Sequence, residues 1–171
     1  MNAINKFPQL VLLVFVLHAS FDGGARQSSN TPIGIFEGST PCGEMPRAFL
    51  RVPVKDSCEF IRWHFTFYQS SITNQPSTFT MKAVFGLTQP NTQGFSKSSQ
   101  QLAEGKWMIR KGIQGNPNAD VYELITTNND TLSFLQLNRD MLHPLDPLGR
   151  LMIGNAGWSY ALSRTDNGVK K

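Results

Sequence analysis

Apolar and polar side chains alternate along two neighbouring segments in the middle of the chain. Every odd position is apolar in residues 61–67 and again in residues 79–87. A period of two with aromatic and β-branched residues is typical of a strand with one buried face. The pattern predicts two strands joined by a turn in residues 70–77. The side chains expected to face the interior, as core or against a ligand, are Trp63, Phe65, Phe67, Phe79, Met81 and Phe85.

Shorter strand signals lie on both sides of this pair. Residues 48–54 predict a strand that Pro53 confines to an edge or an end, because proline cannot donate to a β-ladder. A turn in residues 55–57 would join it to the next strand as a hairpin. Residues 87–104 predict a flexible loop, or a short helix over 98–103. Further strands are expected in residues 106–111, 121–127, 131–137, 151–153 and 158–164. About eight short strands predict an all-β domain, either an antiparallel β-barrel or a β-sandwich.

The N-terminus has the pattern of a secretory signal. Lys6 precedes an almost continuous apolar run in residues 7–17, which small residues follow. The run is shorter than the roughly 20 residues that span a membrane, and no other run is longer, so no transmembrane segment is expected. The predicted organisation is a signal peptide in residues 1–25 with cleavage near 19–25, a linker in 26–33, one domain in 34–165 and a tail in 166–171. The expected location is periplasmic or secreted.

Composition narrows the class of protein. Only 16% of the 171 residues are charged, whereas 40% are hydrophobic and 11% aromatic, and the net charge is +4. Soluble proteins carry about 25% charged residues, and this balance argues against a charged helical bundle or global disorder. Arg62 and His64 alternate with aromatic residues, as in some nucleic-acid-binding surfaces. The outer face of a β-barrel gives the same pattern, so an exported protein with no nucleic-acid partner is expected.

The chain has two cysteines, Cys42 and Cys58. An even count in an oxidising compartment suggests a disulfide. On the predicted hairpin, however, the two residues stand at opposite ends, about 30 Å apart, whereas a disulfide allows about 7 Å between Cα atoms. A bridge would require residues 34–46 to fold back along the strand. The sequence therefore disfavours the disulfide, and Cys58 is expected to pack as a small apolar residue.

Candidate chemistry is sparse. No nucleophile elbow, phosphate-binding loop or zinc-binding helix motif is present, and we expect a protein that is not an enzyme. Cys42 and Met45 offer the soft sulfur ligands that Cu(I) prefers, and His143 could join them if the fold brings it close. These three residues are the candidate metal ligands, with copper as the possible cofactor. The alternative is a turn that buries the cysteine and the methionine.

Three segments in residues 34–164 resemble the N-terminal domain of the copper-resistance lipoprotein NlpE family. They are Gly34-Ile-Phe-Glu-Gly-Ser-Thr-Pro-Cys42, Gly105-Lys-Trp107 and Leu142-His-Pro-Leu-Asp-Pro-Leu-Gly-Arg150. The chain departs from the family at Met45, where the family has a second cysteine, and it lacks the lipoprotein cysteine. The resemblance implies a small lipocalin-like β-barrel in the bacterial envelope that contributes to copper tolerance or envelope-stress sensing by binding. Envelope components or a signalling sensor protein would be its partners.

Two other functions remain open. A barrel of eight strands can hold one small ligand, so a lipocalin-like carrier of an apolar molecule is an alternative, although many large rings favour a filled interior. A hydrolase of envelope material is the weaker alternative. It would need a pocket that joins His64 or His143 to a carboxylate and a serine.

Overall fold

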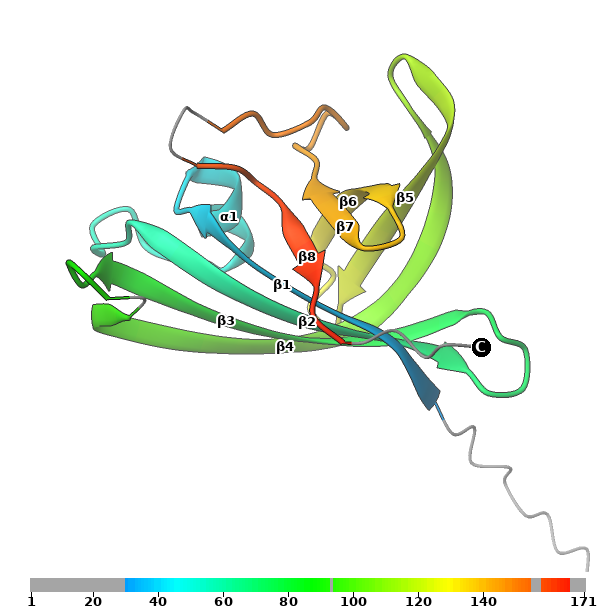
Figure 1. Cartoon of the computed structure of the whole chain (residues 1–171), viewed down its shortest axis with the longest axis horizontal. Helices are drawn as coiled ribbons and strands as arrows, with labels where there is room; N and C mark the ends of the chain where they lie inside the picture. Colours follow the sequence, from blue (N-terminus) through cyan, green and yellow to red (C-terminus); the bar gives the residue numbers. More distant parts are fainter. Residues whose placement is uncertain (1–29, 93, 155–157, 167–171) are drawn as a thin grey trace, which may run out of the picture.

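Eight antiparallel strands form a closed barrel in which each strand pairs with its neighbour in the sequence. The computed structural model describes residues 30–92, 94–154 and 158–166, shown in Figure 1. It confirms the predicted all-β barrel and not the β-sandwich. The predicted signal peptide lies outside the described residues. The elements are β1 (Asn30–Pro41), α1 (Glu44–Phe49), β2 (Phe60–Ser70), β3 (Pro76–Thr88), β4 (Phe95–Ile113), β5 (Asn116–Thr126), β6 (Thr131–Asn138), β7 (Met141–Pro144) and β8 (Leu162–Arg164).

Several element predictions were wrong. The expected strand in residues 48–54 is instead the end of α1 and the turns that follow it. The expected loop in residues 87–104 is largely the first half of β4, the longest strand described. β1 begins at Asn30, inside the segment expected to be a linker. Residues 151–153 contribute only an isolated bridge between Leu151 and Leu145, and the last strand shortens to β8.

Aromatic rings fill the centre of the barrel. Phe65 is fully buried, and its ring centroid lies 5.3 Å from that of Phe134 and 5.7 Å from that of Trp63. Trp63 is also buried, and its indole Nε1–H donates to Thr40 Oγ1 at 2.8 Å, so the ring's one polar group is satisfied. The inward direction predicted for the odd positions of β2 and β3 therefore holds. Of the six side chains expected inside, five are buried and Phe85 is partly buried.

Arg164 ties the short strand β8 to β1. The two strands pair at only two positions, Phe36 with Arg164 and Glu37 with Ser163. The Arg164 guanidinium compensates by lying 4.8 Å from the centre of the Phe36 ring and donating to the carbonyl oxygen of Ile33 at 2.8 Å. Its side chain is only 12% exposed and also lies 3.3 Å from a carboxylate oxygen of Asp166. Side-chain bonds thus close the barrel where the β-ladder is short.

Gly105 lets β4 and β5 approach each other closely. A Cβ atom at this position would lie 2.0 Å from the carbonyl oxygen of Ile125 on β5, a distance that no side chain can occupy. Two residues later Trp107 is buried, and its Nε1–H donates to the carbonyl oxygen of Tyr68 at 2.7 Å. The Gly105-Lys-Trp107 segment therefore serves strand packing and lies in the middle of β4, not at its start.

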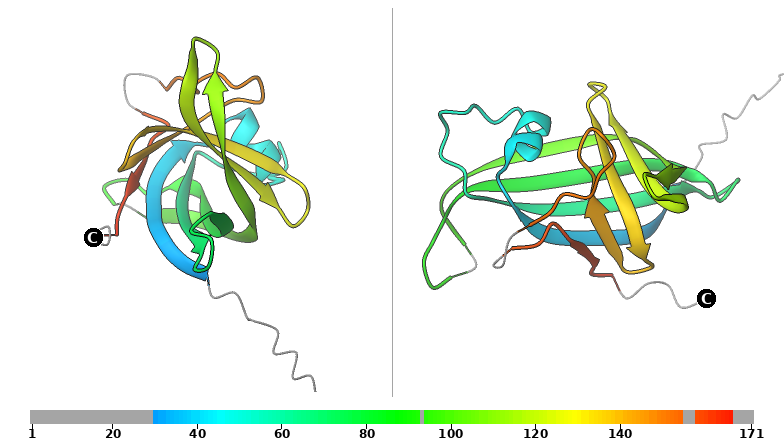
Figure 2. Two further views of the ribbon diagram at one scale, coloured as in Figure 1. Left: turned by 90° about the vertical axis from the view of Figure 1, so that its right-hand side faces the viewer. Right: turned by 90° about the horizontal axis from the view of Figure 1, so that it is seen from above.

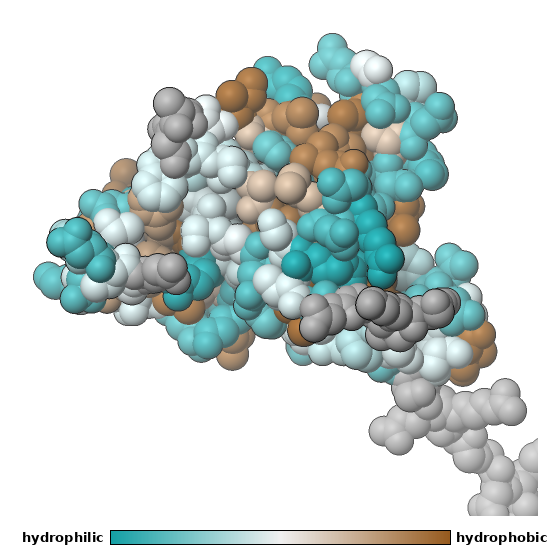
Figure 3. Space-filling view, viewed as in Figure 1, coloured by the Kyte–Doolittle hydropathy of each residue, from teal (hydrophilic) through white to brown (hydrophobic). Residues whose placement is uncertain are grey.

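A second, smaller apolar cluster lies outside the barrel. It consists of Ala119, Val121, Leu135 and Leu145, with Ile113 packed against it. Apolar side chains also remain exposed in the segment after β7, where Leu148 is 74% and Ile153 is 89% exposed. Figure 3 shows apolar surface in this region, beside the β4–β5 hairpin.

The disulfide prediction was wrong, because Cys42 and Cys58 are bonded with their Cα atoms 5.8 Å apart. The expected hairpin does not exist. The chain turns through α1 after Cys42 and returns to the start of β2, where the Cys42 amide donates to the carbonyl oxygen of Glu59 at 2.9 Å. Arg47 of α1 holds this return together, because its guanidinium donates to four carbonyl oxygens of the 42–58 segment. The helix α1 reverses the chain within residues 42–58 and brings the two cysteines together. The alternation of apolar residues did not indicate this helix.

Asp146 organises the turn after β7. Its Oδ1 accepts from the amides of Leu148 and Arg150, both at 2.9 Å, and its Oδ2 lies 2.7 Å from the Arg150 side chain. Gly149 has a φ of +75° in the same turn. These bonds, the backbone bond from Arg150 first, lower the pKa of the Asp146 carboxyl from its ordinary value. The Leu-Asp-x-x-Gly segment is thus a structural turn held by one carboxylate.

The lowered pKa of Asp146 predicts a pH dependence of stability. Because the ionised carboxylate is favoured in the folded state, its contribution is present above the unfolded pKa of about 4 and is lost as pH falls through the lower folded pKa. We expect Asp146→Asn to unfold more easily in urea at pH 7, and the difference from the wild type to shrink below about pH 4. Urea titrations at several pH values measure this difference. A difference that is constant with pH would contradict the assignment.

Candidate binding site at the open side of the barrel

The structure does not support the predicted copper site. Cys42 is bonded to Cys58, so its sulfur is not the thiolate that Cu(I) binding requires, and this part of the prediction was wrong. The Nε2–H of His143 donates to the carbonyl oxygen of Met152 at 2.8 Å, and Met45 packs against the core from α1. Within the described ranges, no group of three or more histidine, cysteine, aspartate or glutamate side chains is placed to hold a metal ion.

His64 meets a carboxylate and a hydroxyl on the outer face of the sheet. Its Nδ1 lies 2.7 Å from Glu37 Oε1, and its Nε2 lies 3.5 Å from Thr66 Oγ1. The order of these groups is that of a catalytic triad, with threonine as the hydroxyl. The His64 and Glu37 side chains are 42% and 46% exposed, however, and β2 pairs on both sides, so its backbone amides are engaged in the ladders. The backbone of β2 therefore offers no free amide that could serve as an oxyanion hole beside this group.

The barrel interior leaves little room for a ligand. A void of about 10 Å³ lies between Trp63, Phe134, Leu162 and neighbouring residues at one end of the core. Small-molecule sites in proteins occupy about 300–1,000 Å³. A carrier that encloses an apolar ligand in the middle of the barrel is therefore not supported by the described residues, because aromatic rings already fill that space.

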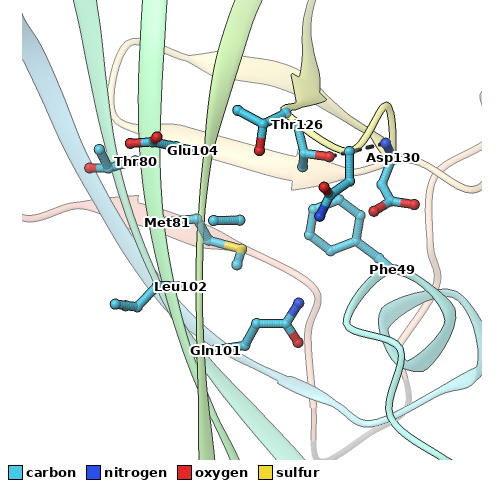
Figure 4. Close-up of a pocket in the computed structure, with 11 residues that line it drawn as sticks. Phe49, Thr80, Met81, Gln101, Leu102, Glu104, Thr126 and Asp130 are labelled. Carbon is cyan, nitrogen blue, oxygen red and sulfur yellow. Dashed lines mark hydrogen bonds between the residues drawn. The ribbon is translucent and has the colours of Figure 1, made fainter.

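A larger pocket of about 430 Å³ opens where β4 runs past the end of β5. We call it the open-side pocket. Phe49 of α1, residues of β3 and β4, and the turn between β5 and β6 surround it, as Figure 4 shows. Its lining residues are Phe49, Thr80, Met81, Gln101, Leu102, Ala103, Glu104, Thr126, Thr127, Asn128 and Asp130.

The two halves of the open-side pocket differ in chemistry. Phe49, Met81 and Ala103 give an apolar floor, and Phe49 is anchored against Trp63 with ring centroids 6.3 Å apart. The β5–β6 turn gives a polar wall, in which the amide of Asp130 donates to Thr126 Oγ1 at 3.0 Å. An apolar floor with a few polar groups at one side is the usual composition of a ligand site.

Ion pairing at the rim of the pocket is uneven. Asp130 lies 2.9 Å from the Arg51 guanidinium, so its charge is balanced from the segment that follows α1. Glu104 is exposed, and its carboxylate has no ion pair or side-chain hydrogen bond within the described part of the chain. A ligand at this rim would therefore meet one uncompensated negative charge.

The open-side pocket leaves no clear signal in the sequence, for an identifiable reason. Residues 96–104 are mostly serine and glutamine and show no apolar alternation, so they were predicted as a loop. They form a strand whose two faces are both largely open to solvent, which removes the period-two signal. Phe49 was also assigned to a strand and not to a helix. The one usable signal was the length of the gap between the strands predicted on either side of residues 87–104.

Comparisons with known proteins identify no relative of this chain. No protein-family model matches the chain, and neither a curated protein nor a solved structure is significantly similar to it. Across the described residues, no helix has both the length and the apolar character needed to cross a membrane.

Proposed function

We propose that this protein is a non-enzymatic binding protein of an oxidising compartment, the periplasm or the exterior of the cell, and that the open-side pocket holds its ligand. The observation that carries the proposal is the contrast between a filled barrel interior and a pocket of about 430 Å³ at the open side. The disulfide supports the compartment, because such bonds persist where thiols are not kept reduced.

The lining of the pocket defines the chemistry of the ligand. An apolar group fits against Phe49, Met81 and Ala103, and hydrogen-bonding groups can meet Gln101 and Asn128. A cationic group would be favoured near Glu104. The ligand we propose is therefore amphipathic, with one apolar portion and at least one hydrogen-bond donor, and neutral or positively charged.

The proposal changes the function implied by the resemblance. A role in copper tolerance depended on Cys42 as a ligand, and the disulfide removes that support. Sensing of envelope stress by binding remains compatible with the open-side pocket, because it requires only a binding surface that a partner or an envelope component can occupy.

Filling the pocket tests the proposal. The neutral fluorescent amine 1-aminoanthracene serves as the probe, because it combines an apolar ring system with one hydrogen-bond donor. We expect the mature wild-type protein to bind it with increased fluorescence, and Ala103→Trp to lose at least about tenfold in affinity because the new ring occupies the floor of the pocket. Met108→Trp, on an exposed position of the same strand, is the matched control and should bind as the wild type does.

Two results would contradict the proposal. One is the absence of saturable binding to the wild type. The other is equal binding by Ala103→Trp and the wild type, provided that circular dichroism shows both to be folded.

A further inference from the structure

We infer that the ligand of the open-side pocket is an extended peptide segment that adds a strand to the free edge of β4. This inference rests on the proposed function and names the class of partner. Addition of a strand to an exposed edge is an established mode of peptide recognition, in which backbone hydrogen bonds give affinity and side-chain pockets give specificity.

The first half of β4 has a partner on one edge only. Residues 95–106 pair with β3, whereas pairing with β5 begins at Gly105. The carbonyl oxygen of Glu104 accepts from the amide of Thr127 at 3.0 Å, and in residues 95–103 no described residue pairs with that edge. Figures 1 and 2 show β4 continuing well beyond the end of β5.

The alternation of an antiparallel ladder identifies the free backbone groups. Glu104 directs its carbonyl group away from β3, so Leu102, Gln100 and Ser98 direct their N–H and C=O groups to the same edge. Gln101 and Ala103 point theirs towards β3. Three alternate residues of β4 thus offer a donor and an acceptor each to an incoming strand.

The open-side pocket occupies the position of that strand. It is lined by residues from both faces of β4, Gln101 and Ala103 on the inner face and Leu102 and Glu104 on the outer face. A pocket that touches both faces of one strand lies beside its edge, where the next strand of a sheet would run about 4.8 Å away. Alternate side chains of a peptide in that position would enter the floor beside Phe49 and Met81.

Charge favours a foreign peptide over a second copy of this chain. Glu104, on the outer face, would attract a lysine or arginine on the same face of the incoming strand. In a two-fold β4–β4 pairing centred on Gln100, Ser96 of the second copy would stand opposite Glu104. In a pairing centred on Gln101, Ser98 would stand there. Neither serine could balance the charge of Glu104. The only cation of residues 95–103 is Lys97, which belongs to the other face of β4. The partner is therefore an extended segment with apolar side chains on one face and a basic residue on the other.

The edge carries few of the features that protect exposed strands. Residues 95–104 contain no proline, Lys97 is their single lysine, and their ladder with β3 has one irregularity, between Phe95 and Lys97. Natural proteins usually protect a long edge with prolines, several charges, bulges or a covering segment. A strand of this length that is left open is consistent with a surface that pairs during function.

Hydrogen exchange tests the free edge directly. In the mature protein at low concentration we expect the amides of Ser98, Gln100 and Leu102 to exchange at least about tenfold faster than those of Gln101 and Ala103. Equal protection of the two sets would overturn the inference, because it would mean that the edge is already covered. Protection that is lost on dilution would assign the edge to a second copy and would also overturn it.

Synthetic peptides test the mode of binding. The probe is an acetylated, amidated peptide in which valine alternates with threonine and one central threonine is replaced by lysine. We expect it to bind, to protect the amides of Ser98, Gln100 and Leu102, and to compete with 1-aminoanthracene. N-methylation of the lysine and its neighbouring threonines should lower affinity at least about tenfold, because these residues direct their N–H groups to β4. N-methylation of the valines is the matched control and should have little effect.

The outcomes separate this inference from the proposed function. Suppose that 1-aminoanthracene binding depends on Ala103, but the peptide does not bind, or binds equally well whether the threonine and lysine or the valine residues are N-methylated. The proposed function is then supported, and strand addition is wrong. If neither probe is affected by Ala103→Trp, both proposals fail. With Glu104→Gln, the preference for the lysine peptide over its threonine parent should disappear, and retention of that preference would overturn the charge assignment.

Discussion

Replacing Phe65 with alanine is expected to lower the free energy of unfolding by about 4 kcal/mol. Phe65 is fully buried in the middle of β2, and its ring neighbours those of Trp63, Phe67, Phe79 and Phe134. Loss of the ring removes apolar burial and leaves a cavity among tightly packed rings, and the surrounding strands, held by their ladders, can collapse into that space only in part. Chemical denaturation monitored by circular dichroism measures the effect.

A matched apolar truncation on the surface separates this effect from a general intolerance to substitution. Ile72 is 60% exposed in the turn between β2 and β3, so Ile72→Ala is expected to change stability by no more than about 0.5 kcal/mol. If Phe65→Ala were equally mild, the barrel interior would not be packed as described, and the argument that ligands are excluded from it would fail.

Removal of the disulfide is expected to have the second largest effect. Cys42 and Cys58 are 16 residues apart, and closing a loop of this size restricts the unfolded chain by about 3 kcal/mol. The free energy of unfolding of the double variant Cys42→Ala/Cys58→Ala should therefore be lower by about 3 kcal/mol, and the variant should unfold at a lower denaturant concentration. Because the bridged segment contains α1 and Phe49, the variant should also bind 1-aminoanthracene more weakly.

Reduction of the wild type provides the internal control. A reducing agent should bring the unfolding midpoint of the wild type close to that of the double variant and leave the variant unchanged. The assigned role of the disulfide would be contradicted if a reducing agent exposed free thiols in the wild type but left its unfolding midpoint unchanged.

The strands at the centre of the barrel could be predicted from sequence because burial on one face leaves a visible pattern. β2 places Ile61, Trp63, Phe65 and Phe67 inside, each less than 5% exposed, and polar or mixed residues outside. Local chemistry also accounts for the turn at Asp146-Pro-Leu-Gly149, because a carboxylate that accepts two backbone amides is a property of a few adjacent residues.

The open side of the barrel could not be predicted, because its features depend on contacts between distant residues. The first half of β4 has no buried face of its own, so nothing in its composition distinguishes it from a loop. The pairing of Cys42 with Cys58 depended on a six-residue helix that begins with no side-chain cap and holds Pro46 near its start. The wrong prediction of residues 48–54 as a strand is the reason that the sequence disfavoured the disulfide.

The central claim is that a partner binds at the open side of the barrel and not inside it. Two-dimensional NMR of the isotope-labelled protein from residue 26 onward, titrated with the lysine-containing peptide, tests this claim most directly. We expect chemical-shift changes at Phe49, along residues 98–104 and in the β5–β6 turn, with the amides beside Phe65 and Phe134 unchanged. Shifts concentrated in the barrel interior, or spread over the outer face of β1 and β2, would contradict it.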